Sequence, residues 1–343
     1  MRKRAVRSVP ADTSILASHR VFTETKTALA KVGKVYAPNP AERFMRPQLN
    51  RLASGANAFL AFMPDAVDEA WLAKAPRLRI IAGALKGYDN LDLEACTRHG
   101  IWVSNVPDLL TIPTAELTIG LMIALARKIR TGDSWVRTRG VSRWRPELYG
   151  VGIHGSTIGF LGLGMIGLAV AERLHAFGAR LLYCDRRAVP AATARRLQLT
   201  RCDLGTLLTQ CDYVIVAMPL NAESHHLLDG RALANCKKGM LLINPSRGSV
   251  VEEAAVLQAL KSGQLGGYAA DVFECEDLSV ADHPARILPG LLHHPATLFT
   301  PHLGSAVERV RREIELRAAG NIVDWAHGLA PRDALNLPDG VSS

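Results

Sequence analysis

The sequence has 343 residues, of which 48% are hydrophobic and 21% are charged, with a formal net charge of +9. At about 150 residues per domain this length favours two domains, and the apolar content is sufficient for two cores. The composition excludes a disordered or low-complexity chain, and the apolar runs are shorter than the ~18 residues that a membrane span needs.

The chain begins with a basic stretch, residues 1–10, that contains Arg2, Lys3, Arg4 and Arg7. No apolar segment of the length found in signal peptides follows, so we interpret this stretch as a basic tail. The six cysteines show no C-x-x-C spacing and are too sparse for a disulfide scaffold. We therefore expect reduced thiols and a cytoplasmic location.

Short apolar runs then alternate with helical patterns, which is typical of parallel sheets joined by crossover helices. The first series of expected strands comprises residues 14–17, 58–63, 79–85 and 102–106. A helix over residues 114–130, with Pro113 just before it, leads to a second series. These later strands are expected at residues 157–161, 180–184, 213–218, 240–244, 267–272 and 297–300.

A last helix, expected over residues 305–326, follows the final strand and can return the chain to the first domain. The sequence thus predicts an α/β fold with two doubly wound parallel-sheet domains. One domain comprises residues 11–110 and 306–335, and the other comprises residues 111–305.

The second domain opens on a glycine motif, Gly162-Leu163-Gly164-Met165-Ile166-Gly167, that fits G-x-G-x-x-G. The motif follows an expected strand and precedes a helical run, which is the context that a dinucleotide site requires. Gly162 permits the tight turn, Gly164 lets the backbone approach a pyrophosphate, and Gly167 allows the helix to pack closely on the strand. Free N–H groups at the helix start would bind the phosphates.

An acidic residue, Asp185, ends the next expected strand, 18 residues after Gly167. A carboxylate there accepts hydrogen bonds from the adenosine ribose and repels a 2′-phosphate, so the sequence predicts NAD. Arg186 and Arg187 follow directly, and an arginine at this place can stack on adenine or pair with a 2′-phosphate. We therefore expect a preference for NAD, with use of NADP through these arginines left open.

Three side chains stand just after consecutive expected strands: Arg247 in Asn-Pro-Ser-Arg-Gly-Ser, Glu276 in Asp-Val-Phe-Glu-Cys-Glu, and His302 in Thr-Pro-His-Leu-Gly-Ser. The carboxyl ends of parallel strands are where open α/β sheets bind ligands. A guanidinium can hold an anion, an imidazole can move a proton, and a carboxylate can orient the imidazole. Each residue alone has an ordinary structural interpretation, but their joint placement favours a catalytic site.

Metal and nucleophile chemistry is not indicated by the sequence. The adjacent pairs His225-His226 and His293-His294 would point to opposite sides of an extended chain and would not bind one ion easily. Neither a G-x-S-x-G motif nor a phosphate-binding P-loop occurs. We expect no metal.

Together, the glycine motif, Asn-Pro-Ser-Arg-Gly-Ser-Val-Val-Glu-Glu and Thr-Pro-His-Leu-Gly-Ser resemble the D-2-hydroxyacid dehydrogenase family, over residues 16–326. Within it, four segments are similar to the branch that oxidises phosphite to phosphate with NAD; they begin at Ala61, Ala84, Val106 and Gly267. Two features favour that branch over general hydroxyacid dehydrogenases. The first is Lys86, because general members usually lack a lysine there. The second is Leu117, which follows Ala-Glu where those members commonly have Ala-Glu-His. The resemblance implies an NAD-binding Rossmann domain inserted in a flavodoxin-like substrate domain.

The resemblance also implies roles for single residues. Arg247 would bind the substrate oxyanion, Glu276 would pair with His302 as general base, and an assisting role of Arg247 in deprotonation stays open. Lys86 would clamp the substrate, with Met63, Tyr149 and Trp144 lining the pocket and Arg311 behind them. The cofactor would be held by Gly162, Gly164, Met165, Ile166, Gly167, Asp185, Arg186, Thr114, Pro219 and Asp271, the last through the nicotinamide amide.

Three alternatives remain at this point. The first is a dehydrogenase that reduces a 2-keto acid to a D-2-hydroxy acid with the same three residues, and Lys86 argues against it. The second is a non-catalytic dinucleotide-sensing protein of the corepressor type. The third, nucleic-acid binding, rests only on the basic charge and has no motif to support it. We expect a homodimer, formed through the helix at residues 114–130 in the family, that binds neither nucleic acid nor membrane.

Overall fold

A computed structural model describes residues 12–39, 44–141 and 146–340. The chain forms two compact units. Unit 1 combines Met1–Leu110 with Val307–Ser343, and unit 2 is Thr111–Ala306. Within the described ranges, no helix is long and apolar enough to cross a membrane.

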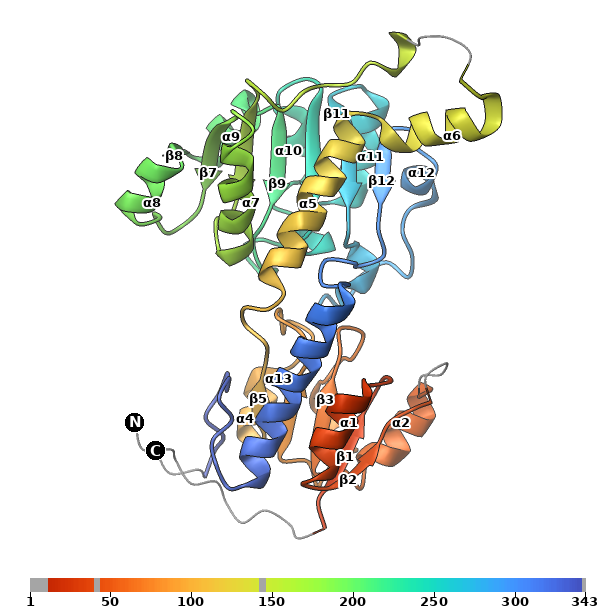
Figure 1. The fold of residues 1–343 in the computed structure, drawn as a ribbon, viewed down its shortest axis with the longest axis vertical. Coiled ribbons are helices and arrows are strands. Elements are labelled where there is room, and N and C mark those ends of the chain that lie inside the picture. The colour runs from red at the N-terminus through yellow and green to blue at the C-terminus, as the bar shows by residue number, and fades with distance from the viewer. Residues whose placement is uncertain (1–11, 40–43, 142–145, 341–343) are drawn as a thin grey trace. The chain divides into compact units, whose positions relative to one another are not determined.

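Unit 1 is built on a five-stranded parallel sheet of order β2-β1-β3-β4-β5, which is the flavodoxin-like order (Figure 1). Its strands are β1 Ser14–Ala17, β2 Lys34–Tyr36, β3 Ala58–Ala61, β4 Ile80–Gly83 and β5 Trp102–Ser104. Its helices are α1 Thr23–Ala30, α2 Arg46–Ala53, α3 Glu69–Leu72, α4 Leu93–Arg98 and α13 Glu308–Ala326.

Helices cover both faces of the sheet in unit 1, and every residue of β3 and β4 is therefore buried. α1 and α13 pack against each other on one face, where Ile314, Ile322 and Trp325 join the core. Trp71 of α3 belongs to the separate core cluster, in which it packs against Phe59 with ring centroids 5.0 Å apart.

Unit 2 contains a seven-stranded parallel sheet of order β12-β11-β10-β9-β6-β7-β8. Its strands are β6 Thr157–Leu161, β7 Arg180–Cys184, β8 Leu199–Arg201, β9 Tyr213–Val216, β10 Met240–Asn244, β11 Leu265–Ala270 and β12 Thr297–Phe299. Its helices are α5 Thr111–Ala126, α6 Ile129–Arg139, α7 Met165–His175, α8 Ala191–Arg196, α9 Leu204–Gln210, α10 Gly230–Ala234, α11 Glu253–Lys261 and α12 Pro289–Leu292, with the 3₁₀ turns η1 Pro146–Leu148, η2 Gly248–Val250 and η3 Glu274–Glu276. The order reverses at β6, which carries the glycine motif at its end.

The predicted α/β fold with two doubly wound parallel-sheet domains is confirmed, but several elements differ from expectation. The helix expected over 114–130 begins at Thr111 and ends at Ala126, and Lys128, with φ of 51°, turns the chain into α6. The strand expected over 267–272 lies two residues earlier, at Leu265–Ala270. The short strands β2 and β8 were not anticipated; both lie at the outer edges of their sheets and carry few apolar residues.

Candidate active site

Three loops at the carboxyl ends of neighbouring strands of the unit 2 sheet carry the predicted side chains. Arg247 follows β10, Glu276 lies in η3 after β11, and His302 follows β12. The strands β10, β11 and β12 are neighbours in the sheet, so the loops at their carboxyl ends are adjacent. This is the edge at which open α/β sheets bind ligands.

The predicted pairing of His302 with Glu276 is present as a hydrogen bond. The distance from Nδ1 of His302 to Oε2 of Glu276 is 2.7 Å, and each side chain is 29% exposed. In the neutral tautomer that this bond favours, Nδ1 donates its proton to the carboxylate and Nε2 keeps a free lone pair. The pair can therefore accept a proton at Nε2 and stabilise the resulting imidazolium.

The backbone at His302 is left-handed, with φ of 55°, which is unfavourable for a residue other than glycine. The carboxylate of Asp271 holds this conformation by accepting bonds from both sides of the histidine. Its partners are the Thr300 hydroxyl at 2.6 Å, the Leu303 N–H at 2.7 Å and the Gly304 N–H at 2.8 Å. Burial raises the pKa of Asp271 although these hydrogen bonds favour its charged form.

The loop that carries Arg247 is packed against the loop that carries Glu276. A Cβ atom added to Gly248 would lie 1.9 Å from the carbonyl carbon of Phe273, so only glycine permits this approach. The Ser249 N–H donates to Asp277 at 2.6 Å and reinforces the contact. The two loops therefore form one rigid support, and Arg247 itself is partly buried with its Nη1 donating to the Ser246 carbonyl at 2.9 Å.

A buried glutamate, Glu253, secures the same support from behind. Its Oε1 accepts the Glu274 N–H at 3.0 Å, while Oε1 of Glu274 accepts the Glu253 N–H at 3.3 Å and bonds Nε2 of His226 at 2.7 Å. Glu253 is fully buried, and burial, together with the nearby acidic residues, raises its pKa to about 7. This arrangement fixes the start of α11 to η3, and thus to the segment of Glu276.

The glycine motif has the geometry that a dinucleotide requires. Gly162 has φ of 85°, and a Cβ atom there would lie 2.7 Å from the Ala217 carbonyl oxygen, so the turn is closed to larger residues. At Gly164, in contrast, nothing lies within 4 Å of an added Cβ, and this residue begins α7 without a side-chain cap. The open space in front of uncapped helical N–H groups fits a pyrophosphate.

The remaining residues of the predicted cofactor site lie near this turn or on other elements of unit 2. Asp185 follows β7 and accepts the Leu163 N–H at 2.8 Å, so its carboxylate is fixed beside the glycine motif. Arg186 is directed to Glu223, with an ion pair of 2.7 Å between exposed side chains. Thr114 is buried in α5 beside Gly304, and Pro219 follows β9. Met165 and Ile166 form the first turn of α7.

Two of the predicted substrate residues of unit 1 lie on loops after its strands, and the third lies in a helix. Lys86 follows β4 and is half-buried; burial lowers its pKa, and Asp108 opposes this shift. Met63 follows β3, and Arg311 lies in the first turn of α13 with its Nη1 3.2 Å from the Ala84 carbonyl oxygen. In unit 2, Tyr149 is 56% exposed after η1. Trp144 lies outside the described residues.

Sequence reasoning missed the supporting residues Glu253, Glu274 and Asp277. Acidic residues at a helix start, such as Glu253, are usually solvent-exposed and stabilise the helix dipole, so the burial of Glu253 was not indicated by the sequence. One sequence feature could have pointed to Glu274 and Asp277. Residues 274–277 are all acidic except Cys275, and they include the expected catalytic residue Glu276.

Comparisons with known proteins agree with this architecture. Residues 119–304 match the model of the D-isomer specific 2-hydroxyacid dehydrogenase NAD binding domain. Over 286 residues the chain is 36% identical to a glyoxylate reductase of Pyrococcus horikoshii, covering 82% of this chain and 83% of that protein. It is 35% identical over 275 residues to glyoxylate/hydroxypyruvate reductase B of Serratia proteamaculans, covering 79% and 81%.

The crystal structure of the TT0316 protein from Thermus thermophilus has the same fold, with a TM-score of 0.84 and 31% identity, covering 94% of this chain and 100% of that one. The seven-stranded sheet with its glycine turn, the matched NAD-binding region and these relatives lead to one assignment. The chain belongs to the D-isomer specific 2-hydroxyacid dehydrogenase family and is an NAD-binding oxidoreductase of that family.

Proposed function

We propose that the chain oxidises phosphite to phosphate with NAD, with His302 as the general base. In this reaction phosphorus loses a hydride and gains an oxygen from water, while one proton is released. NAD supplies the hydride acceptor. The bond between His302 and Glu276 is the observation that supports the acid–base role most directly.

Each of the proposed site residues then has a defined role. Nε2 of His302 takes the proton from the attacking water, and Glu276 keeps the imidazole in the required tautomer and raises its basicity. Arg247 binds the substrate oxyanion through charge-assisted hydrogen bonds. Asp271 acts as a positioning residue, because its hydrogen bonds fix the left-handed backbone of His302.

The proposed specificity for phosphite depends on Lys86. Phosphite is a small, nearly dianionic tetrahedral ion at neutral pH, so its binding benefits from a second cation in addition to Arg247. Lys86 is half-buried, and its pKa is lowered by burial, as expected for an ammonium group held in a partly dry environment. A monocarboxylate substrate would usually need fewer positive charges.

A second candidate function is the reduction of a 2-keto acid such as glyoxylate. The curated relatives favour it over phosphite oxidation, because those reported above are named glyoxylate reductase and glyoxylate/hydroxypyruvate reductase. Their identity of 35–36% supports the shared family chemistry, whereas substrate choice depends on individual side chains in the site. The same three residues would serve this reaction, with His302 donating the proton to the new hydroxyl group.

One assay separates the two candidates. NADH formation is followed by its near-ultraviolet absorbance with phosphite, D-lactate or D-glycerate, and NADH consumption is followed with glyoxylate or hydroxypyruvate. Turnover of phosphite alone supports the first proposal; brisk turnover of a hydroxy or keto acid with phosphite inert supports the second. A lack of turnover on every anion would instead favour a dinucleotide-sensing binding protein.

Two substitutions test the assigned roles in this assay. Replacing His302 by Asn should abolish most turnover, and near-native kcat at neutral pH would show that His302 is not the general base. Lys86→Gln should lower kcat/KM for phosphite by about 10- to 100-fold, the value of a charge-assisted hydrogen bond. Lys74→Gln, at an exposed position of the same unit, is the matched control.

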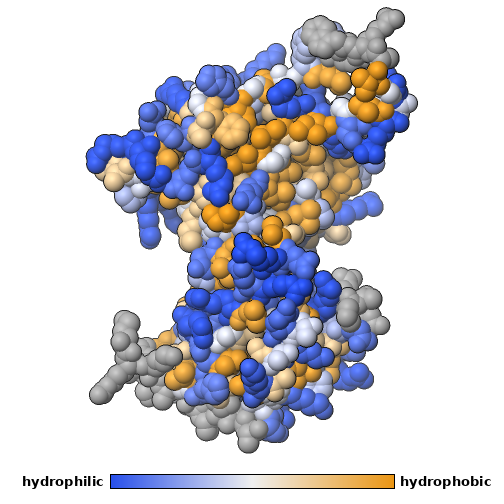
Figure 2. Space-filling model, in the orientation of Figure 1, coloured by the Kyte–Doolittle hydropathy of each residue, from blue (hydrophilic) through white to orange (hydrophobic). Residues whose placement is uncertain are grey.

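We also propose that the protein is a homodimer, joined through α5 and the chain that follows it. Figure 2 shows hydrophobic side chains gathered on the face of unit 2 where α5 lies. Ile112 of α5 is 47% exposed, and Ile129 and Val136 of α6 are 51% and 52% exposed. Apolar surface of this kind commonly marks an interface. Sedimentation analysis of the wild-type protein and of an Ile129→Glu, Val136→Glu variant tests the proposal; a monomeric wild-type protein contradicts it.

A further inference from the structure

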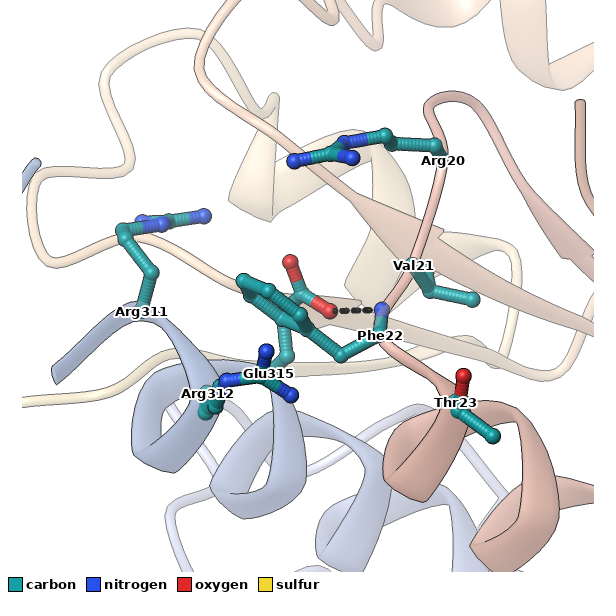
Figure 3. A pocket seen from close by; sticks show the side chains of 7 residues that line it. All are labelled: Arg20, Val21, Phe22, Thr23, Arg311, Arg312 and Glu315. Atoms are coloured by element: carbon teal, nitrogen blue, oxygen red, sulfur yellow. Dashed lines mark hydrogen bonds between the residues drawn. The ribbon is translucent and has the colours of Figure 1, made fainter. Parts of the chain in front are cut away.

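A cavity of about 360 Å³ lies within unit 1, between the link from β1 to α1 and the first two turns of α13 (Figure 3). Three residues of the link, Arg20 to Phe22, form one wall together with Thr23 at the start of α1, and three residues of α13, Arg311, Arg312 and Glu315, form the other. Neither Lys86 nor Met63 lines this cavity. Its lining is unusual because three of the seven residues are arginines.

One of these arginines is already fully engaged. Arg312 pairs with Glu24 at 2.8 Å and with Glu308 at 2.7 Å, and its guanidinium stacks over the Phe22 ring at 4.3 Å. It therefore stabilises the wall of the cavity and has its charge balanced by its own acidic partners. The other two arginines, Arg20 and Arg311, also line the cavity.

The single carboxylate of the cavity, Glu315, is 5% exposed and accepts the Phe22 N–H at 2.9 Å. Burial raises its pKa, and the charges of Arg311 and Arg20 act in the opposite direction. Glu315 therefore offers at most one negative charge to two facing guanidinium groups. The three groups together retain at least one net positive charge.

Arg20 makes no hydrogen bond and no ion pair with any residue that the structure describes; its recorded contact is with the Phe22 ring, 5.9 Å from the centroid. In Figure 3 the guanidinium groups of Arg20 and Arg311 point toward each other across the space above Glu315. Arg311 also donates to the Ala84 carbonyl at 3.2 Å, and a guanidinium carries several N–H donors.

We propose that this cavity binds a small oxyanion, a carboxylate or a tetrahedral ion such as sulfate or phosphate, between Arg20 and Arg311. Guanidinium groups form paired charge-assisted hydrogen bonds with both kinds of anion. The bound anion would neutralise the net positive charge beside Glu315. The cavity shares Arg311 with the predicted substrate residues, whereas Arg20 belongs to the cavity alone, and binding there does not depend on which substrate the protein turns over.

The test is isothermal titration of sulfate and, separately, of acetate into the protein saturated with NAD. Saturation with NAD excludes binding at the glycine motif, and a background that combines Arg247→Gln with Lys86→Gln removes both cations of the proposed substrate site. In that background we expect one remaining anion site. Adding Arg20→Gln should weaken it about tenfold or more, the value of one hydrogen bond between charged groups. Arg51→Gln, at an exposed position on α2 outside the cavity, is the matched control.

A second variant has the opposite expected sign. Glu315→Gln keeps an oxygen to accept the Phe22 N–H but removes the competing charge, so it should strengthen sulfate binding. A misfolded variant would not bind more tightly, so the two opposite shifts exclude simple unfolding. Preference for sulfate or for acetate identifies the class of natural ligand. Loss of all anion binding in the background that lacks both Arg247 and Lys86, or equal affinity with and without Arg20, would overturn the proposal.

Discussion

The carboxylate of Asp271 holds His302 in a left-handed backbone conformation by accepting hydrogen bonds from residues on both sides of it. The His302 N–H also donates to the Asp271 carbonyl oxygen at 2.9 Å. A left-handed conformation costs about 1–2 kcal/mol for a residue other than glycine, so it persists because these bonds determine it. The direction of the imidazole ring is therefore set by the residue that directly follows β11.

Replacing Asp271 by Asn tests this positioning role. The amide can accept through one oxygen only, so at least one of the three bonds is lost and the imidazole moves relative to the reacting atoms. We expect kcat to fall about 10- to 100-fold, since displacements near 1 Å can have this effect. A positioning role predicts an unchanged Kd for NAD, measured by fluorescence titration, whereas a role in holding the nicotinamide amide predicts weaker binding.

The control for Asp271→Asn is Asp212→Asn. Asp212 also accepts a backbone N–H, that of Thr157 at 2.8 Å, but it lies at the opposite end of the unit 2 sheet. Its replacement should lower thermal stability and leave kcat unchanged. An equal loss of kcat in both variants would show that the effect of Asp271 is general destabilisation.

The glycine motif gives a second prediction, because its residues differ in what surrounds them. Gly164→Ala places a methyl group in space that is open in the protein itself, so the thermal midpoint should stay within about 2 °C of the wild type. The same methyl group would occupy the path of the pyrophosphate, so the Kd for NAD should rise about tenfold or more.

Gly152→Ala is the matched control, since nothing lies within 4 Å of its added Cβ either and it precedes β6, whereas the motif follows that strand. It should affect neither stability nor NAD binding. Unchanged NAD affinity in Gly164→Ala would mean that the cofactor does not approach this turn.

Cofactor choice gives a third prediction. Asp185 favours NAD by repelling a 2′-phosphate, while Arg186 is held by Glu223 in an exposed pair. Glu223→Ala releases Arg186 and should raise kcat/KM for NADP a few-fold, and Asp185→Asn should raise it further. Removing Glu172, which pairs with Arg196 in a similar exposed bridge, is the control and should change neither value. A wild-type preference for NADP would refute the assignment of Asp185.

The strands and glycine turn followed from the sequence because local signals were strong there. The limits of β6, β7 and β10 agree with expectation, since alternation of apolar runs with turn residues is a local pattern. Expected strands that ran too far, such as 58–63 and 79–85, continue as apolar chain at Met63 and Leu85. There the backbone leaves the sheet and forms the loops that carry candidate substrate residues, a change that apolar character does not reveal.

The pairing of His302 with Glu276 was also predictable, because strand order places the ends of β11 and β12 side by side. The left-handed turn at Lys128 and the buried carboxyl of Glu253 were not. Both depend on tertiary contacts: α5 packs in the core of unit 2 up to Ala126, and Glu253 is enclosed by η3. Local sequence carries little information about such burial.

Glu253 gives the last prediction, which concerns stability and pH. Burial raises its pKa in the folded protein from 4.5 to about 7, so the folded state keeps a proton that the unfolded state releases between these values. The resulting stabilisation is fully present below pH 4.5 and is lost as the pH rises through about 7. The loss is on the order of 3 kcal/mol at most, since each unit of pKa corresponds to about 1.4 kcal/mol.

Replacing Glu253 by Gln removes this titration and keeps an oxygen that accepts the Glu274 N–H. Relative to the wild type, Glu253→Gln should therefore gain free energy of unfolding between about pH 5 and pH 8, measured by urea denaturation at each pH. Val256→Ala, a buried substitution in the same helix, should destabilise the protein equally at both values. The second oxygen of Glu253, Oε2, is buried and has no hydrogen-bond partner among the described residues. Identical pH dependence of the wild type and Glu253→Gln would mean that Glu253 is ionised in the folded protein. Water or a cation would then have to reach Oε2.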